Sequence, residues 1–246
     1  MPQKRLAEYF CDHKDELSQI DQRSDFLSRI ADKYDLAHIT YFCLPETVEG
    51  EHSSRLITTY SDDWKDHYFA SGYVEIDPVL RDGVRKFLPF DWSELNPKST
   101  IEKQFFGEAR EFGIYDFGLT VPVRGSDGRI ALFSVNSKLS QTDWDYYKHK
   151  NVSEILHFAH LFHHVIASEI SGCEAKVTLT RREKQVLFWA GRGKTCWETA
   201  KILGLTERTV DFYMRNASHK LGAATKTQAV AKAIADGQIF HTVDPG

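Results

Sequence analysis

The fold of the C-terminal part is decided by residues 179–223, which read "LTRREKQVLFWAGRGKTCWETAKILGLTERTVDFYMRNASHKLGA". Their pattern predicts three short helices separated by glycine-containing turns. Thr180 and Glu183 form a capping box at the start of the first helix. Thr195 and Thr206 are suited to begin the second and third, because a threonine hydroxyl accepts a hydrogen bond from the backbone of the first helical turn. We therefore expect a small helical domain here.

The third predicted helix has two unlike faces. An apolar stripe at helical spacing would anchor it to the domain: Val210, Tyr213, Met214, Ala217 and Leu221. The opposite face is polar and basic: Arg208, Asp211, Phe212, Arg215, Asn216 and His219. Two helices joined by a short turn, the second with such a face, are typical of a helix-turn-helix that binds double-stranded DNA in the major groove. The predicted DNA contacts are Thr195, Thr206, Arg208, Thr209, Asp211, Phe212, Arg215, Asn216 and Lys220.

The charge distribution agrees with this prediction. The chain of 246 residues has a net charge of −4. From Lys176 onward there are 12 basic and 6 acidic side chains, whereas the preceding residues have 19 basic and 29 acidic ones. A basic tail behind an acidic domain favours contact of the tail with a polyanion such as DNA. A charge-neutralising contact between the two parts is the alternative.

The first 170 residues read as a separate domain of mixed secondary structure. Strands are expected at 37–44, 55–60, 117–124 and 129–137, and helices at 13–33, 62–71, 99–112 and 141–170. Strands in adjacent pairs, with helices before, between and after them, predict an α+β fold: an antiparallel sheet in an α/β/α sandwich, followed by an all-α domain. We place the domains at 1–170 and 177–246, with a linker at 171–176.

Composition excludes several classes of protein. No apolar run is long enough to span a membrane, and the N-terminus lacks the apolar region of a secretion signal. Cys11, Cys43, Cys173 and Cys196 have no metal-binding or disulfide spacing. The histidines of "HFAHLFHH" lack accompanying carboxylates or cysteines, so we expect no metal. These features predict a soluble cytoplasmic protein without a cofactor.

Two sets of residues resemble one known family. The pattern around Glu183, Leu187 and Gly193 is similar to the LuxR-type helix-turn-helix, although Asp211 departs from the basic or polar residue usual at its position. In the N-terminal domain the similarity rests on residues in fixed order: Tyr60, Trp64, Tyr68, Tyr73, Asp77-Pro78, Trp92 and Gly118. This set resembles the autoinducer-binding domain of LuxR-type quorum-sensing regulators, which bind N-acyl-homoserine lactones.

The resemblance implies a role for each polar residue of a ligand pocket. Asp77 would accept a hydrogen bond from the amide N–H of the lactone, and Trp64 would donate one to the ring carbonyl. Tyr60 and Ser134 would serve the acyl carbonyl, and Trp92 would lie against the lactone ring. Weaker candidates for the wall around the acyl chain complete the set: Tyr68, Phe106, Tyr115 and Thr120.

Each of these residues also has a purely structural interpretation. Asp77 before Pro78 is a favourable helix N-cap, and this role is compatible with ligand binding. Trp64 and Trp92 could be ordinary core aromatics. Gly118 is expected to allow close approach of the backbone without touching a ligand.

The resemblance further implies a homodimer on a palindromic operator, because one helix-turn-helix covers only a few base pairs. We expect an apolar seam for that dimer on the last helix, formed by Ala229, Val230, Ala233 and Ile234. RNA polymerase is the expected partner of an activator, although the residues leave activation and repression open. The alternative is a regulator that responds to another molecule, such as an aryl lactone, or that acts without ligand. An enzyme is disfavoured because no nucleophile motif or metal motif is present.

Overall fold

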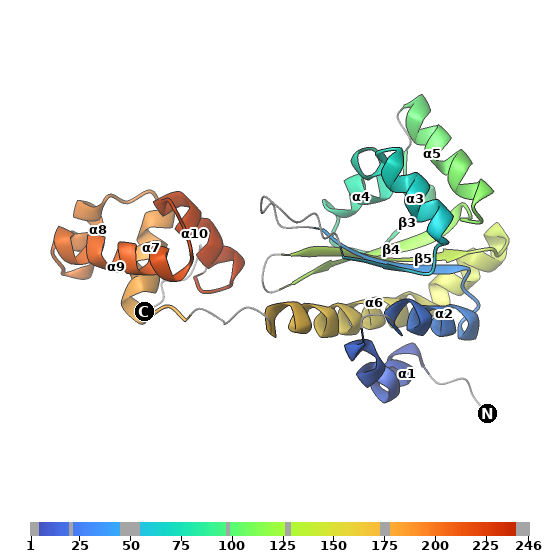
Figure 1. Cartoon of the computed structure of the whole chain (residues 1–246), viewed down its shortest axis with the longest axis horizontal. Coiled ribbons are helices and arrows are strands. Elements are labelled where there is room, and N and C mark those ends of the chain that lie inside the picture. The colour runs from blue at the N-terminus through green and yellow to red at the C-terminus, as the bar shows by residue number, and fades with distance from the viewer. Residues whose placement is uncertain are drawn as a thin grey trace. The chain divides into compact units, whose positions relative to one another are not determined.

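The computed structural model describes residues 5–19, 22–44, 55–96, 99–125, 129–172 and 178–239. The chain divides into two compact units (Figure 1). The N-terminal unit comprises residues 1–125 and 130–170, and the C-terminal unit comprises residues 171–246 with 126–129. Residues 173–176 of the predicted linker and 126–128 of the predicted hairpin turn lie outside the described residues.

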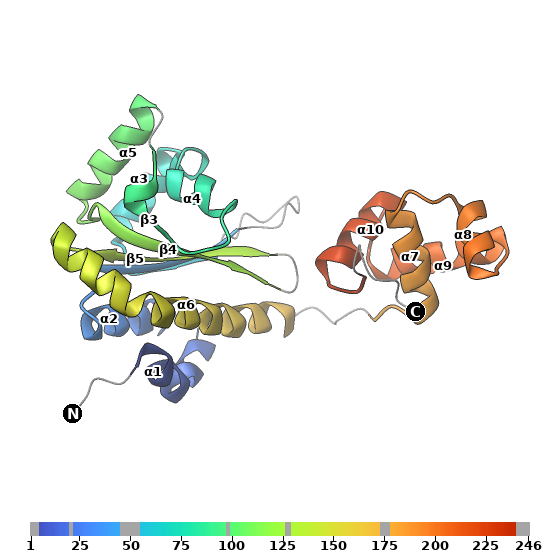
Figure 2. The same cartoon turned by 180° about the vertical axis from the view of Figure 1, so that it is seen from behind.

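The N-terminal unit is built on one antiparallel sheet, whose described strands follow the order β2–β1–β5–β4–β3. They are β1 (His38–Cys43), β2 (Arg55–Thr58), β3 (Phe90–Asp91), β4 (Phe117–Arg124) and β5 (Ile130–Ser137). Each predicted pair of strands is antiparallel, and β1 pairs with β5 to join the two pairs. The short strand β3 is an addition to the four predicted strands. Helices lie on both faces of the sheet (Figures 1 and 2), which confirms the predicted α+β sandwich.

Three helices lie on one side of this sheet: the second and third pack against it, and the first packs on these two, away from the sheet (Figure 1). They are α1 (Leu6–His13), α2 (Arg23–Lys33) and α6 (Gln141–Gly172). Odd-numbered residues of β1, β4 and β5 point to this face, because side chains alternate along a strand. Ile39, Val121 and Phe133 are at most 1% exposed there, packed in one core with Trp144 and Phe158 of α6. This core is the main hydrophobic centre of the unit and supports the sheet from this side.

The predicted helix 13–33 is wrong as a single element. The structure has α1, a 3₁₀ helix η1 (Lys14–Ser18) and then α2. Leu17 is fully buried from the 3₁₀ turn, and the Arg23 guanidinium donates a hydrogen bond to its carbonyl at 2.9 Å. The apolar residues of this stretch have helical spacing because successive elements bury their side chains in the same core, although they do not form one helix.

Further helical elements cover the other face of the sheet (Figure 2). They are α3 (Asp62–Ala70), η3 (Tyr73–Glu75), α4 (Pro78–Gly83), η4 (Trp92–Glu94) and α5 (Thr100–Glu111). Their starts follow from local sequence: the Ser61 hydroxyl caps α3, the Asp77 carboxylate caps α4, and Ser99 with Glu102 forms a capping box on α5. A second, mainly aromatic cluster lies under these elements.

The C-terminal unit contains four described helices. They are α7 (Arg181–Gly191), α8 (Cys196–Leu203), α9 (Glu207–Lys220) and α10 (Lys226–Ala235). Thr180, Thr195 and Thr206 cap the first three, as predicted. Gly204 ends α8 with a φ of +66°, a left-handed conformation that glycine adopts without the steric cost of a Cβ. The unit therefore has the predicted helix-turn-helix architecture in α8 and α9.

The predicted apolar seam on α10 is largely wrong. Ala229 and Ala233 are fully buried in the core of the C-terminal unit, where α10 packs on α7. Only Ile234, at 43% exposed, presents a large apolar surface, while Val230 is partly buried against the same core. The small residues of α10 therefore allow helices of one unit to pack closely.

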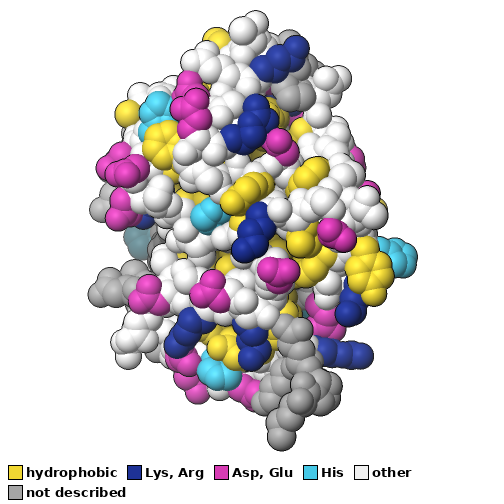
Figure 3. All heavy atoms as spheres, turned by 90° about the vertical axis from the view of Figure 1, so that its right-hand side faces the viewer, with side chains coloured by type: hydrophobic (Ala, Val, Ile, Leu, Met, Phe, Trp, Pro, Cys, Tyr) yellow, Lys and Arg dark blue, Asp and Glu magenta, His cyan; other side chains and the backbone are white. Residues whose placement is uncertain are grey.

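The surface carries both signs of charge. On the face shown in Figure 3, acidic and basic side chains are interspersed with hydrophobic ones.

Among the described helices none has the length and apolar composition to cross a bilayer.

Candidate functional site

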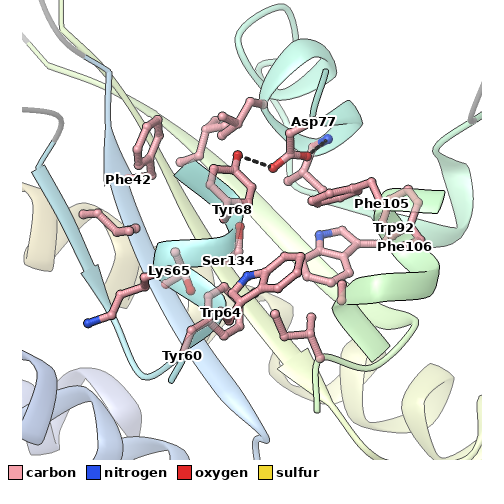
Figure 4. Close-up of a pocket in the computed structure, with 17 residues that line it drawn as sticks. Phe42, Tyr60, Trp64, Lys65, Tyr68, Asp77, Trp92, Phe105, Phe106 and Ser134 are labelled. Atoms are coloured by element: carbon pink, nitrogen blue, oxygen red, sulfur yellow. Dashed lines mark hydrogen bonds between the residues drawn. The ribbon is translucent and has the colours of Figure 1, made fainter. Parts of the chain in front are cut away.

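A cavity lies between the sheet and the helices α3, α4 and α5 of the N-terminal unit (Figure 4). The empty space in the cavity and in its open mouth, which includes some bulk solvent, amounts to about 730 Å³. Apolar and aromatic side chains form most of its wall, with a few polar groups among them. The lining residues are Thr40, Phe42, Leu56, Tyr60, Trp64, Lys65, Tyr68, Asp77, Val79, Leu80, Trp92, Phe105, Phe106, Ala109, Ile114, Leu132 and Ser134. Such a composition is typical of a site for a small, mostly apolar molecule.

Asp77 is the acidic residue of this wall, and its side chain has two partners. Oδ1 accepts a hydrogen bond from the Val79 backbone N–H at 2.7 Å, which makes Asp77 the N-cap of α4. Oδ2 accepts one from the Tyr68 hydroxyl at 2.9 Å (Figure 4). Asp77 is only 8% exposed. The residue is therefore a helix cap and a polar group of the cavity at once.

The protonation of Asp77 is shifted by its surroundings. Burial raises the pKa of its carboxyl to about 6, although the hydrogen bonds from Tyr68 and the α4 backbone act in the opposite direction. Burial and the neighbouring Asp77 together raise the pKa of Tyr68 well above its ordinary value, so Tyr68 remains a hydrogen-bond donor. A buried acceptor that ionises only near neutral pH is an unusual group to maintain in an apolar wall.

Aromatic contacts hold Trp64, the N–H donor of the wall, in place. Trp64, 3% exposed, lies with its ring centroid 5.9 Å from that of Tyr68 and 6.0 Å from that of Phe105. The indole N–H of Trp64 can only donate. Figure 4 shows the Trp64 and Trp92 indoles, Tyr68 and Asp77 together at the cavity. The wall of one cavity thus holds both an N–H donor, Trp64, and a carboxylate acceptor, Asp77.

A polar cluster ties α3 to α5 and so fixes the wall. Glu108 lies 2.6 Å from Nε2 of His67 and accepts hydrogen bonds from Tyr73 and, at 2.7 Å, from Gln104. The hydrogen bond from Tyr73, with those from His67 and Gln104, lowers the pKa of Glu108 to about 2. The carboxylate therefore stays ionised and joins the two helices that carry most of the aromatic lining.

Trp92 is fitted against the sheet at Gly118. A Cβ built on Gly118 would lie 2.3 Å from Cδ2 of the Trp92 ring, far inside van der Waals contact. Only glycine lets the indole approach, which is the close-approach role predicted for Gly118. The Trp92 N–H donates a hydrogen bond to the Thr120 hydroxyl at 2.9 Å, and Thr120 lies 2.8 Å from the hydroxyl of Ser134.

The structure brings most of the predicted ligand residues to one cavity. Those that line it are Tyr60, Trp64, Tyr68, Asp77, Trp92, Phe106 and Ser134. Thr120 is fully buried behind Ser134 and Trp92 and does not line the cavity. Tyr115 also lies outside the lining, because its side chain is 44% exposed and its backbone is bound by the Asn136 amide.

Several lining residues were not predicted. The even-numbered strand residues Thr40, Phe42 and Leu132 share a face with Ser134, and strand alternation could have identified them. Phe105 and Ala109 lie on the inward face of α5, whose period also places Glu102 there. Lys65 lines the wall with its stem while Nζ pairs with Asp62 at 2.5 Å. No sequence motif distinguishes Lys65.

The C-terminal unit presents the outer face of α9. Arg208, Phe212 and Arg215 are exposed, and Thr209, Asp211 and Asn216 are partly exposed. Asp211 forms an ion pair with the guanidinium of Arg215 one turn later, with Nε at 3.0 Å. This pair explains the acidic residue on a basic face, because Asp211 orients an arginine whose remaining N–H groups stay available.

Lys220, predicted to bind DNA, has an intramolecular partner. Its Nζ lies 2.8 Å from Glu183, whose side chain is 4% exposed and which also completes the capping box of α7. Thr195 and Thr206 are engaged as helix caps, with their hydroxyls accepting from backbone N–H groups at 3.2 Å. Lys220 therefore joins α9 to α7, and the exposed centre of α9 is the better candidate for base contacts.

Comparison with known proteins finds a matching family model for each of the two units. Residues 19–166 match the family model of the autoinducer binding domain, and residues 177–233 match that of bacterial regulatory proteins of the luxR family. The chain is 33% identical over 195 residues to the transcriptional activator protein VanR of Vibrio anguillarum, covering 76% of this chain and 78% of VanR. It is 30% identical over 192 residues to the transcriptional activator protein LuxR of Aliivibrio fischeri, covering 75% of this chain and 74% of LuxR.

A solved structure with the same overall fold is SdiA of Escherichia coli. Its TM-score is 0.68 at 20% identity, covering 95% of this chain and 97% of SdiA. At this identity the likeness supports the fold of both units and leaves the ligand to be argued from the cavity.

Proposed function

The chain belongs to the LuxR family of bacterial transcriptional regulators, and from this premise we propose that it is a quorum-sensing regulator that binds an N-acyl-homoserine lactone in the cavity. As a dimer, it would bind palindromic promoter DNA through α8 and α9. The family consists of transcription factors, so the expectation that the chain is not an enzyme agrees with its membership. Nothing in this role calls for a cofactor other than the signal molecule.

The match between buried polar groups and ligand polar groups carries this proposal. An acyl-homoserine lactone has one amide N–H, an acyl carbonyl and a ring carbonyl, followed by an apolar tail. Asp77 supplies an acceptor for the N–H, and Trp64 supplies a donor for the ring carbonyl. Tyr60 and Ser134 supply hydroxyls for the acyl carbonyl. Each polar atom of the ligand would otherwise cost about 1–3 kcal/mol when buried unpaired.

The apolar wall suits the tail. Phe42, Leu56, Val79, Leu80 and Leu132 line the cavity together. Burial of each methylene contributes about 0.8 kcal/mol, so six methylenes give roughly 5 kcal/mol, which is comparable to the whole stability of many domains. Occupation of the cavity should therefore stabilise the folded protein strongly.

The aromatic part of the wall favours one alternative. Trp64, Tyr68, Phe105 and Phe106 offer several ring faces and edges, which would also suit an aryl-homoserine lactone. The head group would be held in the same way, and only the tail would differ. Parallel measurements with aryl and alkyl lactones separate the two.

DNA binding would depend on α9. Arg215 is pre-oriented by Asp211 for a bidentate hydrogen bond to guanine, and the exposed Phe212 ring would contact a thymine methyl group. Two copies reading half-sites about 34 Å apart would require a palindromic operator. Because VanR and LuxR are transcriptional activators, we infer activation and contact with RNA polymerase for this chain as well.

Thermal unfolding of the full chain tests ligand binding. Ligand at 100 times its Kd should stabilise the folded state by about 2.7 kcal/mol and raise the melting temperature accordingly. A matched free fatty acid, which has the tail without the amide and the lactone, is the control. An unchanged melting temperature with saturating alkyl and aryl lactones alike would contradict the proposal.

A further inference from the structure

A buried carboxylate on the edge strand β3 lies directly before Trp92 but on the opposite face of the sheet. Asp91 pairs with Leu119 of β4, a residue of the core under α6, so its side chain points away from the cavity. Trp92 is the next residue and lines the cavity. Two neighbouring residues of one short segment therefore serve the two faces of the sheet.

The Asp91 carboxylate, only 5% exposed, accepts three hydrogen bonds. Its Oδ2 accepts one from the Trp144 indole N–H at 2.8 Å and one from the Lys148 ammonium at 2.6 Å, both on α6. Its Oδ1 accepts one from the Ser93 backbone N–H at 2.7 Å. Burial alone would raise the pKa of this carboxyl, but the hydrogen bonds from Lys148, Ser93 and Trp144 outweigh it and lower the pKa. The carboxylate therefore stays ionised and binds the short segment to α6.

The Trp144 partner of Asp91 is itself held by its neighbours. Trp144 is fully buried, and its ring stacks on that of Tyr147 with the centroids 5.9 Å apart and an interplanar angle of 13°. The Tyr147 hydroxyl donates a hydrogen bond at 2.8 Å to the backbone carbonyl of Tyr34, which follows α2. Asp91 is thus tied to side chains whose positions are set by both α2 and α6.

The backbone that carries Trp92 is a short piece of chain at the edge of the sheet. Strand β3 pairs with β4 at two residues only, and η4 after it is a single 3₁₀ turn. Phe87 and Leu88, just before β3, are exposed. Few ladder hydrogen bonds can fix so short a strand, so its position depends on the side chains that anchor it. Asp91 is the charged anchor among them.

Resting on the proposed function, in which Trp92 lies against the lactone ring, we propose that Asp91, Trp144 and Lys148 are positioning residues for ligand recognition. None of the three lines the cavity, so they act through the backbone of residues 90–92 and the Trp92 indole that it carries. A binding side chain contributes fully only when its supporting contacts hold it in the productive geometry. Lys148 therefore contributes to lactone affinity from the opposite face of the sheet.

The competing role of this ion pair is purely structural. Gly118 and Thr120 also contact the Trp92 ring and could place it by themselves, in which case Asp91 and Lys148 would only stabilise the unit. Loss of Lys148 would then affect lactone affinity equally with and without the indole, or leave it unchanged. The dependence on Trp92 therefore distinguishes the two roles.

The test is a double-mutant cycle in the full chain, with Lys148→Met, Trp92→Leu and the double variant. The probe is N-octanoyl-homoserine lactone or, if the wild type binds it more tightly, N-benzoyl-homoserine lactone. Lys148→Met should weaken the Kd about tenfold in the wild type and less than about twofold in the Trp92→Leu background, where no indole remains to be positioned. Asp145→Asn is the matched control: it removes the other carboxylate on Lys148, at 3.0 Å, and should leave the affinity unchanged because Asp91 keeps its partner.

Three results would overturn the inference while the proposed function stands: an equal loss from Lys148→Met in both backgrounds, no loss from it in the wild type, or no loss from Trp92→Leu alone. Failure of both lactones to bind the wild type would instead reject the proposed function. The melting temperature of each ligand-free variant shows whether it folds. If Lys148→Met does not fold, Trp144→Phe takes its place in the cycle, because it removes the N–H donor to Asp91 and keeps a ring in the core; its expected loss is about threefold.

Discussion

Replacing Asp77 by asparagine and by alanine separates its two roles. Asparagine is as good an N-cap as aspartate, so Asp77→Asn keeps the hydrogen bond from Val79 and the start of α4. Its amide nitrogen would take the place of the second carboxylate oxygen, which accepts from Tyr68 in the free protein. The ligand N–H would then face a donor in place of an acceptor.

The magnitudes follow from these contacts. Loss of a charge-assisted hydrogen bond and an unpaired ligand N–H together should cost about 2–4 kcal/mol, or roughly 30- to 1000-fold in Kd. The free protein should change in the opposite direction at pH 7. Because burial raises the pKa of Asp77 from 3.8 to about 6, its ionised form is held at a cost of roughly 3 kcal/mol, which a neutral amide avoids. Asp77→Asn should therefore be at least as stable as the wild type without ligand.

Alanine removes the cap as well. Asp77→Ala should be less stable than Asp77→Asn by about 0.5–2 kcal/mol, because the Val79 N–H loses the acceptor that asparagine keeps. Urea unfolding of the ligand-free proteins and calorimetric titration with the lactone supply the two quantities. Unchanged affinity in Asp77→Asn would refute the ligand role, and equal stability of the two variants would refute the cap role.

Three further outcomes are expected. Because the pKa of Asp77 is raised, the free protein should become less stable as the pH rises between about 4 and 6, while lactone binding becomes tighter. Asp77→Asn should show neither trend. A pH-dependent lactone affinity in that variant would contradict the assignment of both trends to Asp77. Gly118→Ala should lower the melting temperature by roughly 10 °C, because its Cβ would overlap the Trp92 ring; an unchanged value would mean that the indole can move aside. Glu183→Gln should lower the melting temperature of the C-terminal unit, because the ion pair between Glu183 and Lys220 is lost, and should leave the lactone affinity unchanged. A parallel loss of lactone affinity would show that the effect is not confined to the C-terminal unit.

The sequence predicted elements wherever local chemistry decides them. The threonine caps of the C-terminal unit and the Asp77 cap marked helix starts correctly, and paired apolar runs marked four of the five described strands. The two-residue strand β3 was missed, because its pairing with Thr120 is set by the distant strand β4 and not by its own residues. The alanines of α10 were misread for a similar reason, since small residues suit an interface between chains and a close packing within one equally well.

In the cavity, too, some residues could be predicted from their own chemistry and others only from their neighbours in the fold. Residues with distinctive chemistry, such as Asp77 and Trp64, were recognisable from the resemblance to the family. Thr40 was not, because a threonine in a strand becomes informative only when the register with Ser134 is known. Tyr115 was misplaced because its aromatic character fits a wall, whereas the structure leaves it 44% exposed. Chain topology supplies what residue type alone does not.

The proposed ligand binding depends above all on a hydrogen bond from the amide N–H of the ligand to the Asp77 carboxylate. Calorimetric titration of the wild type with an acyl-homoserine lactone, and with the ester in which oxygen replaces the amide N–H, measures that contact directly. We expect saturable binding of one lactone per chain and a Kd for the ester that is at least about 30-fold weaker. In Asp77→Asn this difference between amide and ester should shrink severalfold or more. Equal binding of the amide and the ester by the wild type would contradict the proposed hydrogen bond.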